Sequence, residues 1–221
     1  MSPSRAAIAI DGPAASGKSS TAKAVARELG YRHVDSGSLY RAATAARLRR
    51  DTDSALWTED SVLDAARAVT LSPAENGFVP LLNNRLADDE MRGEAVTNRV
   101  SLVARMPRVR EWVNAQVRNA ARDNDVVVDG RDIGTVVFPN ATLKIFLVAA
   151  PEERARRRVL ERTGHEPTEV ELFDESARIL LRDELDATQS ERAPDAVVID
   201  TTELAQPEQI AKIVKLARSA V

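Results

Sequence analysis

The chain has 221 residues, of which 43% are apolar and only 4% aromatic, so Val, Ile, Leu and Ala must fill any core. It contains no cysteine, which excludes disulfides and thiolate metal sites and suits a reducing compartment. The net charge of −3 does not indicate a general nucleic-acid or membrane surface. At this length we expect a single α/β core that carries insertions.

The positive charge comes mostly from arginine, with 26 Arg against 5 Lys. Arginine suits bidentate recognition of phosphate, but a GC-rich genome produces the same bias. For most individual arginines we therefore prefer a solvated helix face. The first residues form no long apolar run, and no stretch approaches the roughly 20 apolar residues of a membrane span, so we expect a soluble, cytoplasmic protein.

The most informative segment runs from an apolar, strand-like stretch, Ala6–Ile10, into a helix-forming stretch, Thr21–Leu29. Between them Gly12, Gly17, Lys18 and Ser19 fit the pattern G-x-x-x-x-G-K-[ST], which is typical of a phosphate-binding loop in this strand–loop–helix context. Such a loop points backbone N–H groups at phosphates, and the lysine reaches the β- and γ-phosphates while the serine hydroxyl ligates Mg²⁺. The alternative is a Gly/Ser-rich turn without a ligand. We expect the chain to bind a nucleoside triphosphate.

Apolar runs separated by helical patterns predict an α/β fold, namely a five-stranded parallel sheet flanked by helices. The predicted strands are Ala6–Ile10, Tyr31–Val34, Asp125–Val128, Leu143–Val148 and Ala196–Ile199. A last helix is predicted over Pro207–Val221.

Two insertions interrupt this pattern. The first follows the second strand and is far longer than a crossover helix requires. It predicts helices over Ser38–Arg50 and Glu59–Ala68, a hairpin of Gly77–Leu82 with Arg85–Leu86 turning at Asn83-Asn84, and a helix over Pro107–Arg122 that Pro107 can open. The second insertion, 154–193, is rich in Arg, Glu and Asp.

We therefore expect a P-loop kinase core made of residues 1–35, 116–153 and 194–221, a monophosphate-binding insertion over 36–115 and a lid over 154–193. Insertions placed after strands can close over two ligands at the carboxyl ends of the strands and exclude water.

Charged side chains follow two of the predicted strands. The second strand leads into Asp35-Ser36-Gly37-Ser38-Leu39-Tyr40-Arg41, and the third into Asp129-Gly130-Arg131-Asp132. Asp-Ser-Gly alone could be a turn with a helix N-cap. Arg41 and Arg131, however, provide the charge-assisted donors that an acceptor phosphate requires.

These segments resemble the bacterial cytidylate kinases, a family of nucleoside monophosphate kinases, over nearly the whole chain. The matching pieces are IDGPAASGKSS, DSGSLYRA, RVSLVARMPRVR, DGRDIGTVVFP, LKIFL followed by ERARRR, and RDELD. DSGSLYR and GRDIGTVVFP are specific to this group rather than general features of P-loop proteins.

The resemblance implies transfer of a phosphoryl group from ATP, with Mg²⁺, to CMP or dCMP. It places the ATP phosphates on Gly12, Pro13, Ala14, Ala15, Ser16, Gly17, Lys18, Ser19 and Ser20, with Lys18 bridging to the transferred group and Ser19 on the metal. It implies acceptor contacts from Ser36, Tyr40, Arg41, Ser101, Arg110, Arg131, Asp132, Arg182 and Asp186. Arg154, Arg157 and Arg158 match lid arginines that meet ATP on closure, so Lys18, Arg131, Arg154 and Arg158 would be catalytic.

These roles are chemically reasonable. A monophosphate is already nucleophilic at neutral pH, so catalysis consists of positioning and neutralising charge. A carboxylate that accepts from the cytosine N4 amine, with a guanidinium that donates to N3 and O2, favours cytosine over uracil. Asp132 and Arg110 fit this pair of roles.

Several residues have a simpler alternative. Arg110 could pair with a nearby acid on its helix, and Ser101 could be only a helix hydroxyl. Arg156 is expected to face solvent. His33 and His165 are expected to be structural or surface residues, and Trp57 and Trp112 to serve packing.

One position departs from the family pattern. Many members have an arginine three residues after the second Asp of R-D-x-x-D, where this chain has Gln189, and the segment that follows is short. A lid-side contact to the acceptor is then lost or supplied by Gln189 or Arg192.

Two rival functions remain. One is a kinase for another small substrate, such as UMP, shikimate or uridine, which has no reason to carry both specific segments. The other is a nucleotide sensor or nucleic-acid-binding protein without turnover, which would not need Lys18 and the clamp arginines. A GTPase would need N-K-x-D, which is absent from the sequence. We expect small-molecule substrates, no nucleic acid or membrane partner, and a monomer, because an enclosed two-substrate site needs no second subunit.

Overall fold

The computed structural model describes residues 5–220, which form two compact units. The first unit contains residues 31–126 together with Arg5, and the second contains residues 6–30 and 127–220. Residues 1–4 of the expected core and Val221 of the expected last helix lie outside the described residues.

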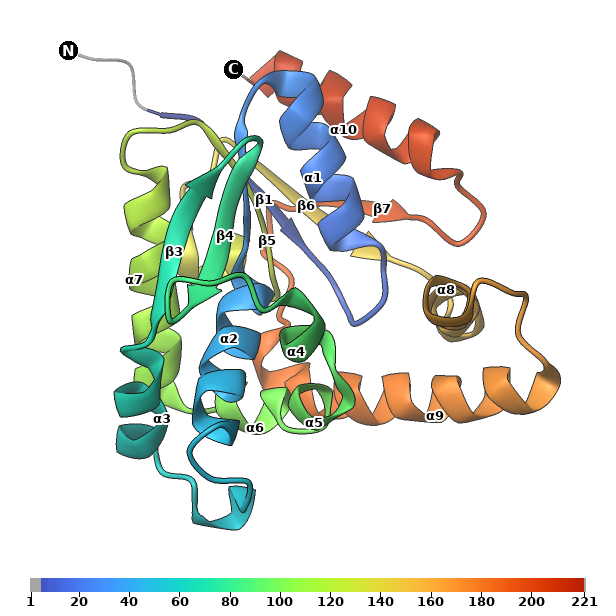
Figure 1. The fold of residues 1–221 in the computed structure, drawn as a ribbon. Coiled ribbons are helices and arrows are strands. Elements are labelled where there is room, and N and C mark those ends of the chain that lie inside the picture. The colour runs from blue at the N-terminus through green and yellow to red at the C-terminus, as the bar shows by residue number, and fades with distance from the viewer. Residues whose placement is uncertain (1–4, 221) are drawn as a thin grey trace. The chain divides into compact units, whose positions relative to one another are not determined.

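The second unit contains the strand order β5-β1-β6-β7 (Figure 1). Its strands are β1 (Ala7–Asp11), β5 (Val126–Asp129, whose first residue belongs to the first unit), β6 (Leu143–Val148) and β7 (Val197–Asp200). β1 pairs with β6, and β6 with β7, all parallel. Ile8, Ile10, Ile145 and Leu147 are almost fully buried, so these strands are the centre of the apolar core.

The helices of the second unit are α1 (Lys18–Leu29), η2 (Ile133–Val137, one π-helical turn), α8 (Pro151–Thr163), α9 (Glu169–Asp186), η3 (Ala187–Gln189) and α10 (Gln206–Ala220). α1 and α10 lie side by side (Figure 1). The buried Gln209 side chain of α10 donates to the Thr21 hydroxyl of α1 at 2.7 Å. α9 begins with a capping box in which Thr168 and Glu171 satisfy each other's backbone N–H groups.

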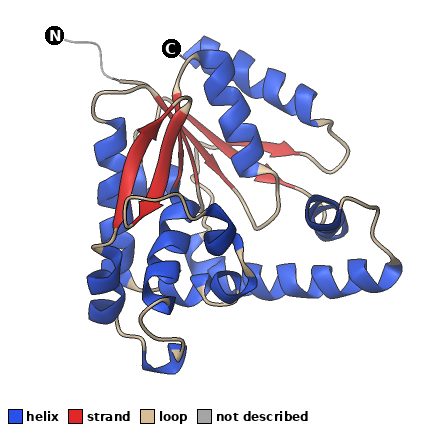
Figure 2. Ribbon diagram, in the orientation of Figure 1, coloured by secondary structure: helices blue, strands red, loops and turns tan. Residues whose placement is uncertain are grey.

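The first unit contains the strand order β3-β4-β2, in which β4 pairs parallel with β2 and antiparallel with β3. Its strands are β2 (Arg32–Asp35), β3 (Val69–Ala74) and β4 (Gly77–Leu82), and its helices are α2 (Ser36–Leu48), η1 (Ser54–Leu56), α3 (Glu59–Ala66), α4 (Asp88–Arg92), α5 (Glu94–Thr97), α6 (Val100–Ala104) and α7 (Pro107–Ala121). Figure 2 shows β3 and β4 as the two long neighbouring arrows.

The mostly parallel α/β architecture is confirmed, but residues 5–220 contain seven strands rather than five. The five predicted strands are all present, shifted by at most one residue at either end. The two extra strands form a hairpin within the first insertion.

The predicted hairpin is therefore wrong in its partner. β4 pairs with the preceding segment, Val69–Ala74, and not with Arg85–Leu86. A tight turn does form at Asn83 and Asn84, whose φ angles are 52° and 60°, but only one isolated bridge, between Leu82 and Arg85, follows it. Residues 83–86 are exposed, so a strand there would bury no apolar surface and would not be stabilised.

Candidate functional site

The phosphate loop of the second unit links β1 to α1 and depends on two glycines. Gly12 has φ 149°, and a Cβ atom there would lie 2.3 Å from the carbonyl oxygen of Leu147. Gly17 has φ 82° and is the N-cap of α1, with no side-chain cap. The first backbone N–H groups of α1 are thus not capped by its N-cap side chain, which is the arrangement that receives an anion at a helix N-terminus.

Lys18 lies inside this loop. Its side chain is buried, and its ammonium group donates to the carbonyl oxygen of Pro13 at 2.6 Å and to the Ser16 hydroxyl at 3.4 Å. Burial, and next the charge of Arg131, lower the pKa of Lys18 well below its ordinary value. An anionic phosphate in the loop would reverse this effect, because a nearby negative charge favours the protonated ammonium.

Ser19 and Asp129 form a short hydrogen bond between the serine hydroxyl and the carboxylate at the end of β5. Both groups supply hard oxygen ligands, which fit Mg²⁺ in a P-loop site, where the metal keeps several waters. The expected metal ligand was Ser19 alone, and the structure adds Asp129 as a second candidate. Its position directly after the predicted strand Asp125–Val128 was the available signal.

A cluster of charged residues follows β5 and lies on α9. The Asp186 carboxylate is 3.4 Å from Nε of Arg131 and 3.8 Å from Nε of Arg182. The charges of both arginines also lower the pKa of Lys18, although burial is the larger cause. Three predicted site cations, Lys18, Arg131 and Arg182, therefore act on one another through their charges, and Asp186 pairs with the two arginines.

The predicted lid arginines lie in three different environments. Arg154 is buried, and its Nη1 donates to the Ala14 carbonyl oxygen at 3.0 Å and contacts the Asp183 carboxylate at 2.5 Å. Arg158 pairs with Glu161 on its own helix at 2.9 Å. Of these two, the structure therefore places only Arg154 in contact with the phosphate loop.

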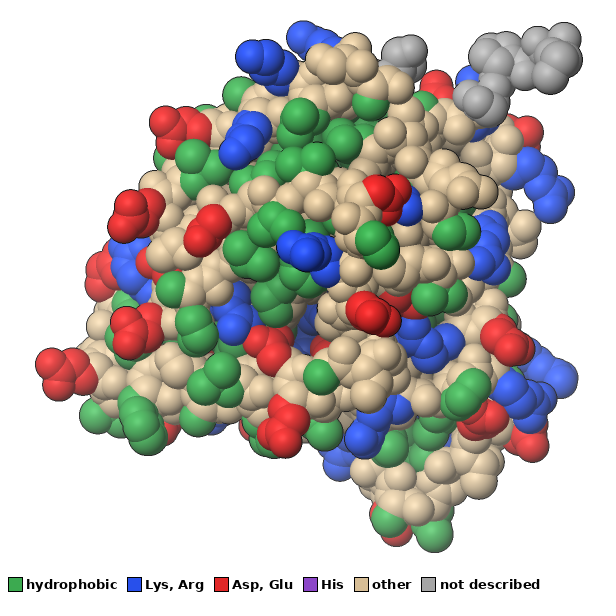
Figure 3. Space-filling view, turned by 180° about the vertical axis from the view of Figure 1, so that it is seen from behind, with side chains coloured by type: hydrophobic (Ala, Val, Ile, Leu, Met, Phe, Trp, Pro, Cys, Tyr) green, Lys and Arg blue, Asp and Glu red, His purple; other side chains and the backbone are tan. Residues whose placement is uncertain are grey.

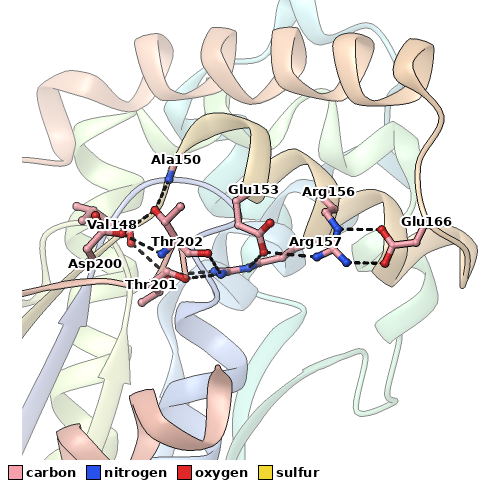
Figure 4. A network of polar contacts seen from close by, with 9 residues as sticks. All are labelled: Val148, Ala150, Glu153, Arg156, Arg157, Glu166, Asp200, Thr201 and Thr202. Carbon is pink, nitrogen blue, oxygen red and sulfur yellow. Dashed lines mark hydrogen bonds and ion pairs between the residues drawn. The ribbon is translucent and has the colours of Figure 1, made fainter. Parts of the chain in front are cut away.

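Arg157 belongs to a polar network at the end of β7 (Figure 4). Its side chain pairs with Glu153 at 2.8 Å and donates to the Thr201 hydroxyl at 3.1 Å and to the Thr201 carbonyl oxygen. The neighbouring Arg156 is exposed and pairs with Glu166, which agrees with its expected place at the surface.

The predicted site residues of the first unit lie on three helices. Ser36 and Tyr40 are buried on α2, where Asp35 is the N-cap and accepts from the Ser38 N–H at 3.0 Å. Arg41 donates to the Met91 carbonyl oxygen and the Thr97 hydroxyl, each at 3.1 Å. Ser101 is buried on α6, and Arg110 on α7 donates to the Ala104 carbonyl oxygen at 3.2 Å.

Asp132, in the second unit, is buried and directly precedes the η2 turn. Gln189 ends η3, and Arg192 is exposed. Trp57 is buried, with the Arg47 guanidinium 5.5 Å from its ring centroid, whereas Trp112 is half-buried on α7. His33 is half-buried in β2 and His165 is exposed.

A family model described as cytidylate kinase matches residues 8–219. The chain is 44% identical to a cytidylate kinase of Geobacillus kaustophilus over 98% of both chains, and 40% identical to one of Bacillus cereus over 96% of both. This chain belongs to the cytidylate kinase family. It is therefore an enzyme, a nucleotide-binding kinase.

Two solved structures are similar to the chain along nearly its whole length. A shikimate kinase of Bacteroides thetaiotaomicron is 17% identical with a TM-score of 0.48, and each chain is covered to 97%. The structure TT1252 from Thermus thermophilus is 19% identical with a TM-score of 0.44 over 97% of both chains. Among the described residues of this cytidylate kinase family member, no helix is long and apolar enough to span a membrane.

Proposed function

We propose that this enzyme transfers the γ-phosphoryl group of ATP to CMP and dCMP, forming CDP and dCDP. The observation that carries the proposal is the cluster of Lys18, Arg131 and Arg182 beside the phosphate loop. The charges of Arg131 and Arg182 add to burial in lowering the pKa of Lys18, so the site is suited to several phosphate charges. Membership in the cytidylate kinase family supports the nucleotide and its base.

On the donor side, residues 12–20 would cradle the ATP phosphates through backbone N–H groups, and Lys18 would bridge to the transferred group. To reach it, the Lys18 ammonium would exchange its bond to the Pro13 carbonyl for a phosphate oxygen. Ser19 and Asp129 would hold Mg²⁺. The metal, when bound, neutralises charge on the β- and γ-phosphates.

On the acceptor side, Arg131 and Arg182 would bind the monophosphate, with Arg41 as a further clamp. The Asp186 carboxylate pairs with Arg131 and Arg182 and so orients both side chains. Asp132 and Arg110 would read the cytosine edge, and Ser36, Tyr40 and Ser101 would complete the acceptor contacts. The N4 amine of cytosine donates a hydrogen bond that the Asp132 carboxylate can accept, whereas uracil has an acceptor oxygen at this position, so Asp132 would reject uracil.

The reaction needs no strong base, because the attacking monophosphate oxygen is already ionised near neutral pH. The rate would come from alignment and from arginines that meet the negative charge of the transferring group. Arg131, Arg154 and Arg158 are proposed for this role, and Arg157 for binding the donor. Arg158 would have to leave Glu161 to take part.

We further propose that segments 36–115 and 154–193 act as the monophosphate-binding insertion and the lid, and that the enzyme works as a cytoplasmic monomer without nucleic acid. The mixture of blue and red side chains on the face drawn in Figure 3 supports the last point, since nucleic-acid binding favours a continuous basic surface. Hydrogen exchange that shows no protection of either segment when both nucleotides are added would contradict the closure.

A coupled assay of ADP release tests the function. ATP and Mg²⁺ are supplied with CMP, dCMP, UMP or AMP in turn, and the matched control replaces Lys18 by Met. We expect fast turnover with CMP and dCMP and little with the other two. Strong turnover with UMP would show that the proposed base-reading roles are wrong, and no turnover with any acceptor would overturn the proposal.

A further inference from the structure

Asp11 is a buried carboxylate to which neither the family resemblance nor the proposed mechanism gives a role. It is the last residue of β1, is 5% exposed and directly precedes Gly12. Its Oδ1 accepts from the backbone N–H of Ile133 at 2.9 Å, and its Oδ2 from that of Gly134 at 2.8 Å. One side chain therefore connects the start of the phosphate loop to the segment after β5.

The segment that Asp11 holds is the first part of the η2 turn, and Asp132 is the N-cap of that turn. An aspartate at an N-cap normally accepts from the first N–H groups of its own helix. The Asp132 side chain makes no such bond, and the Asp11 carboxylate takes these N–H groups instead. The Asp132 carboxylate is thereby not used as a cap.

The fit around this contact is close. A Cβ atom on Gly134 would lie 3.2 Å from Cδ of Lys144 and 3.4 Å from Oδ2 of Asp11. Residue 134 is thus held between a lysine stem and the carboxylate, so the backbone of residues 132–134 has little room to move. The backbone of residue 132 is restrained as well, because it is next to the N–H groups of Ile133 and Gly134 that Asp11 binds.

The contact is also costly to maintain. Burial raises the pKa of Asp11 to about 6, although the two backbone hydrogen bonds oppose this shift. The charged groups that face it are Asp132, which adds to the rise, and Lys18, which opposes it. A residue chosen only for packing would avoid this desolvation, so a functional reason for the carboxylate is indicated.

We infer that Asp11 is a positioning residue for recognition of the acceptor base: it caps the η2 turn in place of Asp132 and so presents the Asp132 carboxylate to the base. The inference rests on the proposed function, since it requires that Asp132 read the base.

Asp11→Asn tests it, because the amide keeps one acceptor oxygen but turns two N–H donors toward a backbone N–H. Steady-state kinetics are measured with CMP and with UMP as acceptors, at saturating ATP, and separately with ATP varied. We expect the KM for CMP to rise roughly tenfold, as for loss of a hydrogen bond to a charged group, and the preference for CMP over UMP in kcat/KM to fall by a similar factor. The KM for ATP is expected to change less than about twofold, because no hydrogen bond to the phosphate loop is lost.

Gly134→Ala provides a second variant that crowds the same contact while leaving the Asp11 charge in place. It is expected to lower the CMP preference in the same direction and keeps the inference testable if Asp11→Asn does not fold. Asp123→Asn, a change of the same type on the surface, should leave all constants unchanged.

The outcomes separate the two proposals. A wild-type enzyme that prefers CMP, with variants that keep this preference, would overturn the inference alone. A raised KM for ATP with unchanged base preference would also overturn it, since Asp11 would then serve the phosphate loop. A wild-type enzyme without preference for CMP would overturn the proposed function and this inference together.

Discussion

The backbone N–H of Ala14, inside the phosphate loop, donates to the Asp183 carboxylate on α9 at 3.0 Å, although the two residues are 169 positions apart. The other oxygen of Asp183 contacts Nη1 of Arg154 at 2.5 Å, and Arg154 in turn donates to the Ala14 carbonyl oxygen. Both helices of the predicted lid segment are thus tied to a single residue of the loop.

Asp183→Asn is expected to weaken this attachment. The buried Arg154 guanidinium would lose its partner charge, so we expect the free energy of unfolding to fall by about 2 kcal/mol. The KM for ATP should rise roughly tenfold because Arg154 is no longer held against the loop. Urea denaturation and initial rates measure the two effects. Glu184→Gln, one residue along and exposed, is the control, and equal behaviour of both variants would contradict the role of Asp183.

Lys18→Met is expected to abolish activity without destabilising the fold. Removing a donor aimed at the transferring phosphoryl group typically costs at least about 100-fold in kcat. The folded state lowers the pKa of Lys18, so the folded chain binds this proton less tightly than the unfolded chain, and the charged lysine opposes folding near neutral pH. Thermal unfolding at pH 7.5 should therefore show Lys18→Met at least as stable as wild type. A clearly lower melting temperature would contradict this account.

The raised pKa of Asp11 leads us to expect a specific dependence of stability on pH. Its folded pKa of about 6 lies above the ordinary aspartate value of 3.8, so between these values the folded chain binds the proton more tightly. The contribution of Asp11 to stability consequently grows as the pH falls through 6 and is complete below 3.8. A difference of about two pKa units corresponds to about 3 kcal/mol.

The measurement compares wild type with Asp11→Asn, because carboxylates remote from Asp11 titrate alike in both proteins. When the pH is lowered from 7.5 to 4.5, the free energy of unfolding of wild type should rise by about 2 kcal/mol relative to that of the variant. A constant difference across this range would show that the Asp11 pKa is ordinary.

Asp129→Asn is expected to raise the Mg²⁺ concentration needed for half-maximal activity by roughly tenfold or more, since an anionic oxygen ligand becomes neutral. Titration of Mg²⁺ in the ADP-release assay measures this, and excess EDTA should stop the wild-type reaction. Asp123→Asn is again the surface control. An unchanged Mg²⁺ requirement would remove Asp129 from the metal site.

Much of the fold follows from local sequence. The phosphate loop needs only residues 11–19 and the elements next to it, because glycine spacing and the following helix define it. α7 was predicted to begin at Pro107, as it does, since a proline at the first helical position lacks only an N–H that needs no partner.

The hairpin shows where local patterns were insufficient. Val69–Ala74 contains Pro73, which argues against a strand that is paired on both sides. β3 pairs only with β4 within the first unit, so the missing N–H can be tolerated there. Conversely, Asn83 and Asn84 form the expected turn, but Arg85–Leu86 does not form a strand after it. A turn alone does not stabilise a strand that covers no apolar surface.

The sequence by itself determined the kind of chemistry: a phosphate loop, converging arginines and the segments shared with the cytidylate kinase family. Only the tertiary structure decided which carboxylates contact these groups. Asp11 accepts hydrogen bonds from the η2 turn, and Asp129 accepts one from Ser19. Asp183 contacts Ala14 and Arg154, and Asp186 pairs with Arg131. The reason is physical. Loop and helix patterns depend on residues that are neighbours in the chain. A buried carboxylate instead pairs with charges and N–H groups that packing brings to it from distant segments, so the spacing of residues in the sequence does not predict its partners.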